Sequence, residues 1–217
     1  IEAGKWSVGD RIPSERELAV QFHVSRMTLR QAIQTLVEEG ILERFVGSGT
    51  FVANQKVQEK MSGVTGFTDL MLAQGKQPSS KTISYHVMSP SLSEIEKLKL
   101  KDDAQVLRME RVRYGDDVPI SFEVATIPLE IVEGLSKQEV SESLYRTLET
   151  KKGVMPGHAK QMVSASTASE RIAEYLDIKR GDAILRLRQI SYLQDGRPFE
   201  YVRTQYVGER FEFVLEK

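Results

Sequence analysis

Arg26 and Arg30 are spaced so that both could contact DNA. They lie four residues apart, so on a helix their guanidinium groups share one face and can reach guanine edges or phosphates. The hydroxyl groups of Ser25 and Thr28 can reach phosphate oxygens beside them. No acidic residue occurs between residues 18 and 37. We therefore favour DNA recognition over the alternative that this arginine pair merely solvates a helix face.

A second pair, Arg111 and Arg113, has the spacing of an anion site. The two residues are two positions apart on an expected strand, so both side chains project from one face. Two guanidinium groups on a buried face repel each other unless an anion lies between them, and arginine suits bidentate binding of phosphate or carboxylate. Other segments supply hydroxyl groups, aromatic rings and a carboxylate suited to a phosphorylated sugar. These residues are Phe67, Thr68, Glu123, Ser143 and Tyr145.

The second arginine pair also has an ordinary explanation, which the sequence leaves open. Both arginines could pair with acidic residues of the same hairpin in a charged strand. Arg186 and Arg188 repeat the same spacing, so the spacing alone is a weak signal. The candidate acidic partners are Glu110, Asp116 and Asp117.

Composition excludes several classes of protein. The chain has 217 residues and no cysteine, which excludes disulfide scaffolds, thiolate zinc sites and cysteine nucleophiles and fits a cytoplasmic protein. The three histidines are too scattered for a metal site, and no apolar run approaches the ~18 residues of a membrane-spanning helix. We expect no cofactor, no metal and no membrane contact.

The formal charge of −1 excludes a strongly basic, non-specific nucleic-acid binder. Residues 1–54 contain six basic and seven acidic side chains, so the first block is not basic overall. Its basic side chains are few, but Arg26 and Arg30 lie together in the stretch that contains no acid. We therefore expect few phosphate contacts per chain and a need for dimerisation to gain affinity.

Residues 1–53 are expected to form a winged helix-turn-helix domain. Ser14 and Glu17 have the spacing of a capping box at the start of a helix. Ser25 caps a second helix that ends at Gly40. A hairpin follows, and the order helix, short turn, helix, hairpin is typical of this DNA-binding module.

The wing of this module is expected at Gly47–Gly49, between two runs rich in apolar residues at 41–46 and 50–52. Glycines at the tip would let the backbone approach a DNA groove closely. At the other end, residues 1–6 have the pattern of the last turn of an earlier helix, stopped by Gly4. The first helix of the domain is therefore expected to be truncated.

The second block differs in pattern from the first. Residues 54–62 are polar and are expected to be a linker. Residues 63–217 predict an α+β domain with a largely antiparallel sheet, because turns at 115–117 and 194–196 join strand-like runs directly. Helices are expected near 66–75, 91–99, 138–151 and 168–176. Strands are expected near 80–88, 105–114, 118–127, 158–166, 183–193 and 198–207.

The first block resembles the DNA-binding domain of the GntR family of bacterial transcription regulators. The resemblance rests on the segments Gly9–Ala19, Val24–Ala32, Leu36–Gly40 and Gly47–Val52. It implies a homodimer on palindromic double-stranded operator DNA, with the wing tip in the minor groove. The candidate DNA-contacting residues are Ser14, Arg16, Ser25, Arg26, Thr28, Arg30, Gly47, Ser48 and Gly49.

The second block resembles the UTRA effector domain of the HutC subfamily, whose fold is similar to chorismate lyase. The resemblance rests on Gly63–Thr68, Arg111–Arg113, Val118–Glu123, Ser143–Tyr145 and Phe199–Tyr201, with Tyr206. It implies a dimerisation and effector domain of a repressor of amino-sugar uptake and catabolism genes, released by glucosamine 6-phosphate or N-acetylglucosamine 6-phosphate. The candidate effector-binding residues are Phe67, Thr68, Arg111, Arg113, Glu123, Ser143, Tyr145, Glu200 and Tyr206.

Three alternative functions compete with this one. A HutC-type regulator could serve another pathway and bind a different anionic effector. An enzyme on a lyase-like fold is disfavoured, because the chain has no G-x-S-x-G elbow, H-E-x-x-H motif or P-loop. An architectural DNA binder without an effector would not explain a second block of ~150 residues, which is more than dimerisation needs.

Overall fold

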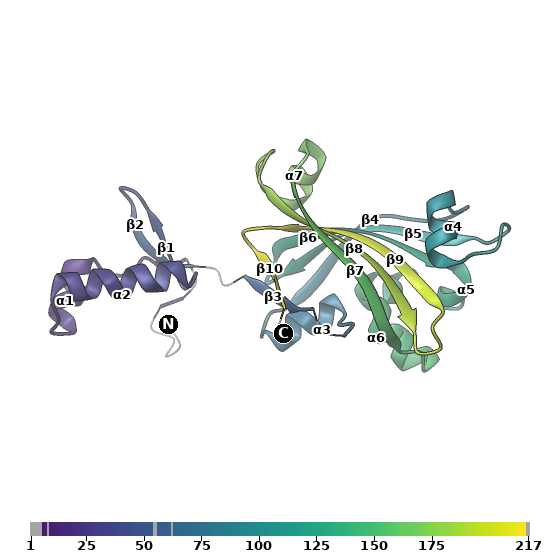
Figure 1. Ribbon diagram of the computed structural model, residues 1–217, viewed down its shortest axis with the longest axis horizontal. Coiled ribbons are helices and arrows are strands. Elements are labelled where there is room, and N and C mark those ends of the chain that lie inside the picture. Colours follow the sequence, from purple (N-terminus) through teal and green to yellow (C-terminus); the bar gives the residue numbers. More distant parts are fainter. Residues whose placement is uncertain (1–5, 8, 54–55, 62, 216–217) are drawn as a thin grey trace. The chain divides into compact units, whose positions relative to one another are not determined.

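The structure is a computed structural model in which residues 6–7, 9–53, 56–61 and 63–215 are described (Figure 1). The chain divides into two compact units, residues 1–56 and residues 57–217. The expected helix end at residues 1–6, with its stop at Gly4, falls almost entirely outside the described residues.

The first unit contains the expected helices and hairpin. Helix α1 (Glu15–Gln21) begins at a capping box in which Ser14 and Glu17 bind each other's backbone amides. Helix α2 (Arg26–Glu38) begins at Ser25, whose hydroxyl accepts from a backbone amide of the first turn. Strands β1 (Leu42–Phe45) and β2 (Gly49–Val52) pair antiparallel. An apolar cluster holds these elements together: Ile12, Leu18, Ala19, Leu29, Ile33, Leu42 and Val52.

The second unit is built on a six-stranded antiparallel sheet, as expected. Its strand order is β4-β5-β6-β9-β8-β7. The strands are β4 (Pro78–Met88), β5 (Val106–Gly115), β6 (Val118–Pro128), β7 (Pro156–Thr167), β8 (Ala183–Leu193) and β9 (Pro198–Val207). The helices are α3 (Phe67–Ala73), α4 (Leu92–Leu98), α5 (Leu129–Val132), α6 (Lys137–Thr147) and α7 (Glu170–Leu176), with a π-helical turn at Leu148–Lys152.

The two faces of the sheet carry different helices. Helices α3 and α6 lie on one side of the sheet, and α7 lies on the other (Figure 1). Met109 and Leu107 of β5 point toward α6, whereas Val112 of the same strand packs with α7. Because side chains alternate along a strand, this division assigns Arg111 and Arg113 to the α6 side. That side is where the candidate effector residues meet.

The structure corrects the expected linker. Residues 57–60 are not linker but strand β3 (Val57–Lys60), which pairs in parallel with β10 (Phe211–Val214). Val57 and Glu59 face inward and their neighbours face solvent. A glutamate on the buried face hides the apolar alternation that identifies a strand. The short elements β10 and α5 were also not expected from the sequence.

The β3–β10 pair depends on Phe211, which is fully buried and stacks on Tyr206 at 3.8 Å between ring centroids. Phe211→Ala should lower the free energy of unfolding by about 3–5 kcal/mol, because a buried ring is replaced by a cavity. Urea denaturation of the purified protein would measure this. Leu215→Ala is the matched control: this side chain is exposed, so the change should stay within ~0.5 kcal/mol. A loss below 1 kcal/mol for Phe211→Ala would contradict the assigned role.

Candidate functional site

The first candidate site is a surface of the first unit formed by the start of α2, α1 and the wing. Arg26 and Arg30 project from the first turns of α2, and the Arg30 side chain is 62% exposed. They border a hollow of about 550 Å³. Five of the positions expected to contact DNA line this hollow: Ser14, Arg16, Arg26, Arg30 and Gly49.

The other four expected DNA positions do not line the hollow. The Ser25 hydroxyl accepts from the Thr28 amide at 3.1 Å, and the two hydroxyl groups are 2.8 Å apart, so this pair fixes the first turn of α2. Gly47 has φ +79°, and the Ser48 amide closes the wing turn by donating to the Phe45 carbonyl at 3.0 Å. These residues shape the start of the helix and the tip of the wing.

Glu15 places an acidic group beside the arginines of the candidate DNA-binding surface. Although residues 18–37 contain no acid, Glu15 of α1 lies 3.3 Å from the Arg30 Nε and 2.9 Å from an Arg44 Nη2. An exposed ion pair contributes ~1 kcal/mol or less to stability. The ion pair mainly orients the Arg30 side chain. The sequence could not reveal this pair, because the two residues lie on different helices.

Arg11 belongs to the same surface and was not singled out from the sequence. It lines the hollow, and its Nε lies 2.7 Å from the position that a Cβ on Gly49 would take. Gly49 has φ +131°, a conformation that side-chain-bearing residues rarely adopt. The glycine is therefore needed both for the backbone turn and for the close approach of Arg11, which sits just before the capped helix.

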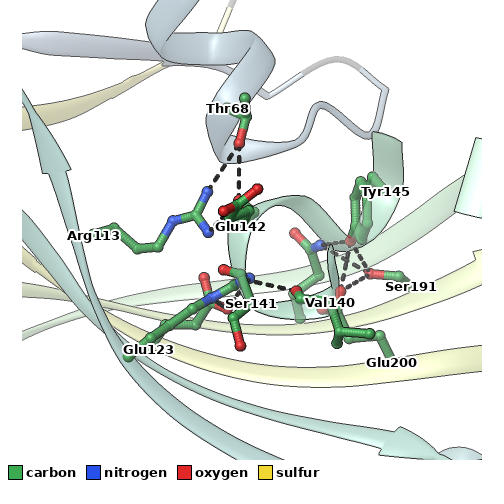
Figure 2. A network of polar contacts seen from close by, with 11 residues as sticks. Thr68, Arg113, Glu123, Val140, Ser141, Glu142, Tyr145, Ser191 and Glu200 are labelled. Carbon is green, nitrogen blue, oxygen red and sulfur yellow. Dashed lines mark hydrogen bonds and ion pairs between the residues drawn. The ribbon is translucent and has the colours of Figure 1, made fainter. Parts of the chain in front are cut away.

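The second candidate site is a cavity of about 60 Å³ in the second unit, between the sheet and helices α3 and α6 (Figure 2). Eight of the nine expected effector residues line it, and the ninth, Thr68, binds Arg113. The structure thus brings together residues that are up to 139 positions apart in the chain. The eight lining residues are Phe67, Arg111, Arg113, Glu123, Ser143, Tyr145, Glu200 and Tyr206.

Arg111 is neutralised inside the cavity wall. It lies directly across the β5–β6 ladder from Glu123, and the closest guanidinium-to-carboxylate distance is 2.6 Å. Its Nη1 also donates to the carbonyl oxygens of Ser141 and Val140 at 2.7 and 3.3 Å. Glu123 is therefore not an unpaired acceptor, because its Oε1 already binds Arg111. None of the hairpin acids weighed earlier pairs with this arginine.

Arg113 is buried without a carboxylate partner among the described residues. Its Nη2 donates to the Thr68 hydroxyl and its Nη1 to the Glu142 carbonyl, both at 3.3 Å (Figure 2). The guanidinium lies over the Phe67 ring at 4.4 Å, and its Nε has no hydrogen-bond acceptor in the described structure. Burial, followed by the neighbouring Arg111 charge, lowers the pKa of Arg113 to about 9. An anion entering the cavity would relieve both effects.

A break in helix α6 supplies the carbonyl acceptors for both arginines. Ser143 has φ −158° and ψ 95°, which are non-helical values. The carbonyl groups of Val140, Ser141 and Glu142, just before the break, accept from the two guanidinium groups. Ser143 falls inside the helix expected near 138–151, and the structure shows that this helix is interrupted there.

Glu200 lies in a separate hydrogen-bonded cluster (Figure 2). The Tyr145 hydroxyl donates to its carboxylate at 2.6 Å and the Ser191 hydroxyl at 3.1 Å. Gln189 donates to both hydroxyl groups, at 3.2 and 2.9 Å. Burial, with the Glu123 charge as a smaller cause, raises the pKa of Glu200 to about 7. Gln189 and Ser191 were missed from the sequence, although they are polar residues at buried positions of β8.

Two kinds of feature are missing from the described part of the chain. It contains no group of three or more His, Cys, Asp or Glu residues that could hold a metal ion. None of its helices has both the length and the apolar composition needed to cross a bilayer.

Comparison with known proteins covers both units. The model for bacterial regulatory proteins of the gntR family matches residues 1–52, and the UTRA domain model matches residues 73–212. The chain is 36% identical to the HTH-type transcriptional repressor NagR of Bacillus subtilis (strain 168) over 214 residues, covering 99% of this chain and 88% of that protein. It is 30% identical to the mannosyl-D-glycerate transport/metabolism system repressor MngR of Escherichia coli (strain K12), covering 99% and 90%.

Solved structures agree with these matches. PhnF from Mycobacterium smegmatis superposes with a TM-score of 0.83 at 27% identity, covering 98% of this chain and 94% of that chain. A GntR-family regulator from Enterococcus faecalis V583 is 60% identical, covers 64% of this chain and 100% of that chain, and has a TM-score of 0.60. The chain therefore belongs to the GntR family of bacterial regulatory proteins, with a UTRA domain as its second unit, and is a DNA-binding transcription regulator rather than an enzyme.

Proposed function

We propose that the protein is a homodimeric repressor that binds a palindromic operator and is released by a phosphorylated amino sugar. The buried, uncompensated charge of Arg113 in a cavity of the UTRA domain carries this proposal. Release of operator DNA requires that the effector bind two states of the dimer unequally, and operator DNA must then weaken effector binding by the same factor. A regulator of bacterial operators would act in the cytoplasm.

Arg113 supports an anionic effector. A phosphate beside its guanidinium would accept the hydrogen bond that the buried Nε lacks and would offset the desolvation of the charge. The hydroxyl of Thr68, which already accepts from Arg113, lies at the start of α3 beside the same space. Arginine and hydroxyl donors together are suited to phosphate oxygens.

The rest of the cavity supports a sugar. Glu200 and the hydroxyl of Tyr145 offer an acceptor and a donor for ring hydroxyl groups, and Phe67 and Tyr206 offer aromatic surface. The names of the relatives point to sugar-related genes, since they include repressors of mannosyl-D-glycerate and fructoselysine systems. Together with the resemblance of the second block to the UTRA domain of the HutC subfamily, these features favour glucosamine 6-phosphate or N-acetylglucosamine 6-phosphate.

Cavity size suggests how the effector could act. A volume of about 60 Å³ is well below the ~300 Å³ of a typical small-molecule pocket. A sugar phosphate therefore needs the cavity walls to move apart, and the walls include α3 and the broken helix α6. Differential binding to a widened state is the free energy by which the effector would shift the dimer.

On the DNA side, we propose that Arg16, Arg26 and Arg30 contact the operator and that the Gly47–Gly49 tip enters the minor groove. Their clustering round one hollow of the first unit supports a single reading surface. Serine and threonine hydroxyls at the start of α2 would add phosphate contacts.

Arg30→Ala should abolish tight operator binding, because a lost bidentate base contact costs about 1–3 kcal/mol and a symmetric dimer loses two. The measurement is fluorescence anisotropy with a palindromic duplex selected by the wild-type protein from a random library. Effector binding by the variant should be unchanged. The control is Arg180→Ala, an exposed arginine of the second unit. Wild-type operator affinity in Arg30→Ala would refute the assigned contact.

Arg113→Met should remove the stabilisation that phosphorylated sugars give, while leaving the ligand-free protein as stable as the wild type or more so. Methionine keeps much of the length, and deleting a buried charge without a counter-ion removes a desolvation cost. In the wild type, an effector at 100 times its Kd should add about 2.7 kcal/mol of stability.

Thermal shift with glucosamine 6-phosphate, N-acetylglucosamine 6-phosphate and the unphosphorylated sugars would measure this. Arg186→Met, an exposed arginine of β8, is the matched control and should respond like the wild type. A normal response to phosphorylated sugars in Arg113→Met would place the anion site elsewhere.

A further inference from the structure

Glu59 is a buried carboxyl group in the effector cavity that the proposed function does not use. It lies on β3, is 9% exposed, and lines the cavity together with Arg113 and Tyr206. The residue was hidden from sequence analysis by its position in the expected linker. A buried carboxyl group is costly unless something in its surroundings binds it.

The other carboxyl groups of the cavity have stronger or more numerous partners than Glu59. Glu123 is paired with Arg111, and Glu200 accepts from two hydroxyl groups. Glu59 has the side-chain amide of Gln161 as its hydrogen-bonding neighbour. No lysine or arginine of the described residues forms an ion pair with it. Burial raises its pKa to about 7, so the surroundings disfavour the carboxylate form.

The cavity therefore contains opposite, unmatched groups. Arg113 is a buried cation without an anion, and Glu59 is a buried acid without a cation. Tyr206 is within electrostatic range of both groups, since both influence its pKa. A ligand with a negative group at one end and a positive group at the other would compensate both at once. A neutral hydroxyl or an amide N–H would donate to Glu59 but would leave its charge uncompensated.

We infer that Glu59 is a specificity-determining residue of the effector cavity, where its carboxylate forms an ion pair with a protonated amine of the effector. This inference rests on the proposed sugar-phosphate effector and narrows it to a phosphorylated sugar with a free amine. An N-acetylated sugar offers only a neutral N–H and brings an acetyl group into the same space. The favoured effector is therefore glucosamine 6-phosphate rather than N-acetylglucosamine 6-phosphate.

The position of Glu59 in the chain gives the contact a second consequence. Residue 56 is the last of the first unit, and Glu59 is the third residue of the second. An effector that binds Glu59 thus acts directly on the strand that leads from the DNA-binding unit. No relay through the sheet is needed to connect the amine with the start of the second unit.

The test compares three ligands with the full chain by isothermal titration calorimetry at pH 8. They are glucosamine 6-phosphate, N-acetylglucosamine 6-phosphate and glucose 6-phosphate. Glu59→Gln, which is isosteric and uncharged, should weaken binding of the amine ligand at least tenfold and change the other two by less than threefold. Glu59→Asp keeps the charge and should retain part of the preference. Glu212→Gln on the paired strand β10 is the control and should bind all three like the wild type.

The possible outcomes distinguish failure of this inference from failure of the proposed function. Unchanged affinity for glucosamine 6-phosphate in Glu59→Gln would overturn the inference and leave the proposed function standing. An equal loss for all three ligands, with a lowered melting temperature, would mark Glu59 as a structural residue and would also overturn it. Failure of the wild type to bind any of the three would overturn the proposed effector class, and this inference with it.

Discussion

A positive charge kept out of water is the constraint around which the second unit is arranged. Arg113 is 2% exposed and has no carboxylate partner among the described residues. Its neighbour Arg111 faces the same side of the sheet, so Glu123 must neutralise one of the two charges. The break in α6 turns carbonyl groups toward the guanidinium groups, and the ring of Phe67 lies under one of them. These arrangements make the charge tolerable without cancelling it, which is why we propose an anionic effector.

The two units use arginine in opposite ways. In the first unit, Arg30 and Arg44 share Glu15 at an exposed surface, where charges interact weakly and are screened by salt. In the second unit, Arg113 lies in surroundings of low dielectric, where one ionic contact has a much larger effect. This contrast suits a protein that binds DNA through a few exposed contacts per chain and, as we propose, responds to a single small ligand.

The sequence predicted what depends on local pattern and missed what depends on register or tertiary contact. Capping residues and helical spacing predicted α1 and α2, and strand-like runs, some of them joined directly by turns, predicted every strand of the large sheet. The pairing of Arg111 with Glu123 follows from cross-strand register, and that of Glu15 with Arg30 from helix packing. Neither is visible in one sequence. Strand β3 was missed because one of its two inward residues is a glutamate, the residue that we propose binds the effector amine.

The parallel pairing of β3 with β10 has a consequence for biosynthesis. The paired strands are separated by 154 positions, and a ribosome adds ~5–20 residues per second. Strand β3 therefore waits roughly 8–30 seconds for its partner, whereas the elements of the DNA-binding unit are already complete. A chain released early would carry a complete DNA-binding unit followed by an incomplete effector unit. Only the completed polypeptide contains both folded units, so the proposed response to the effector is the last property that the nascent protein acquires.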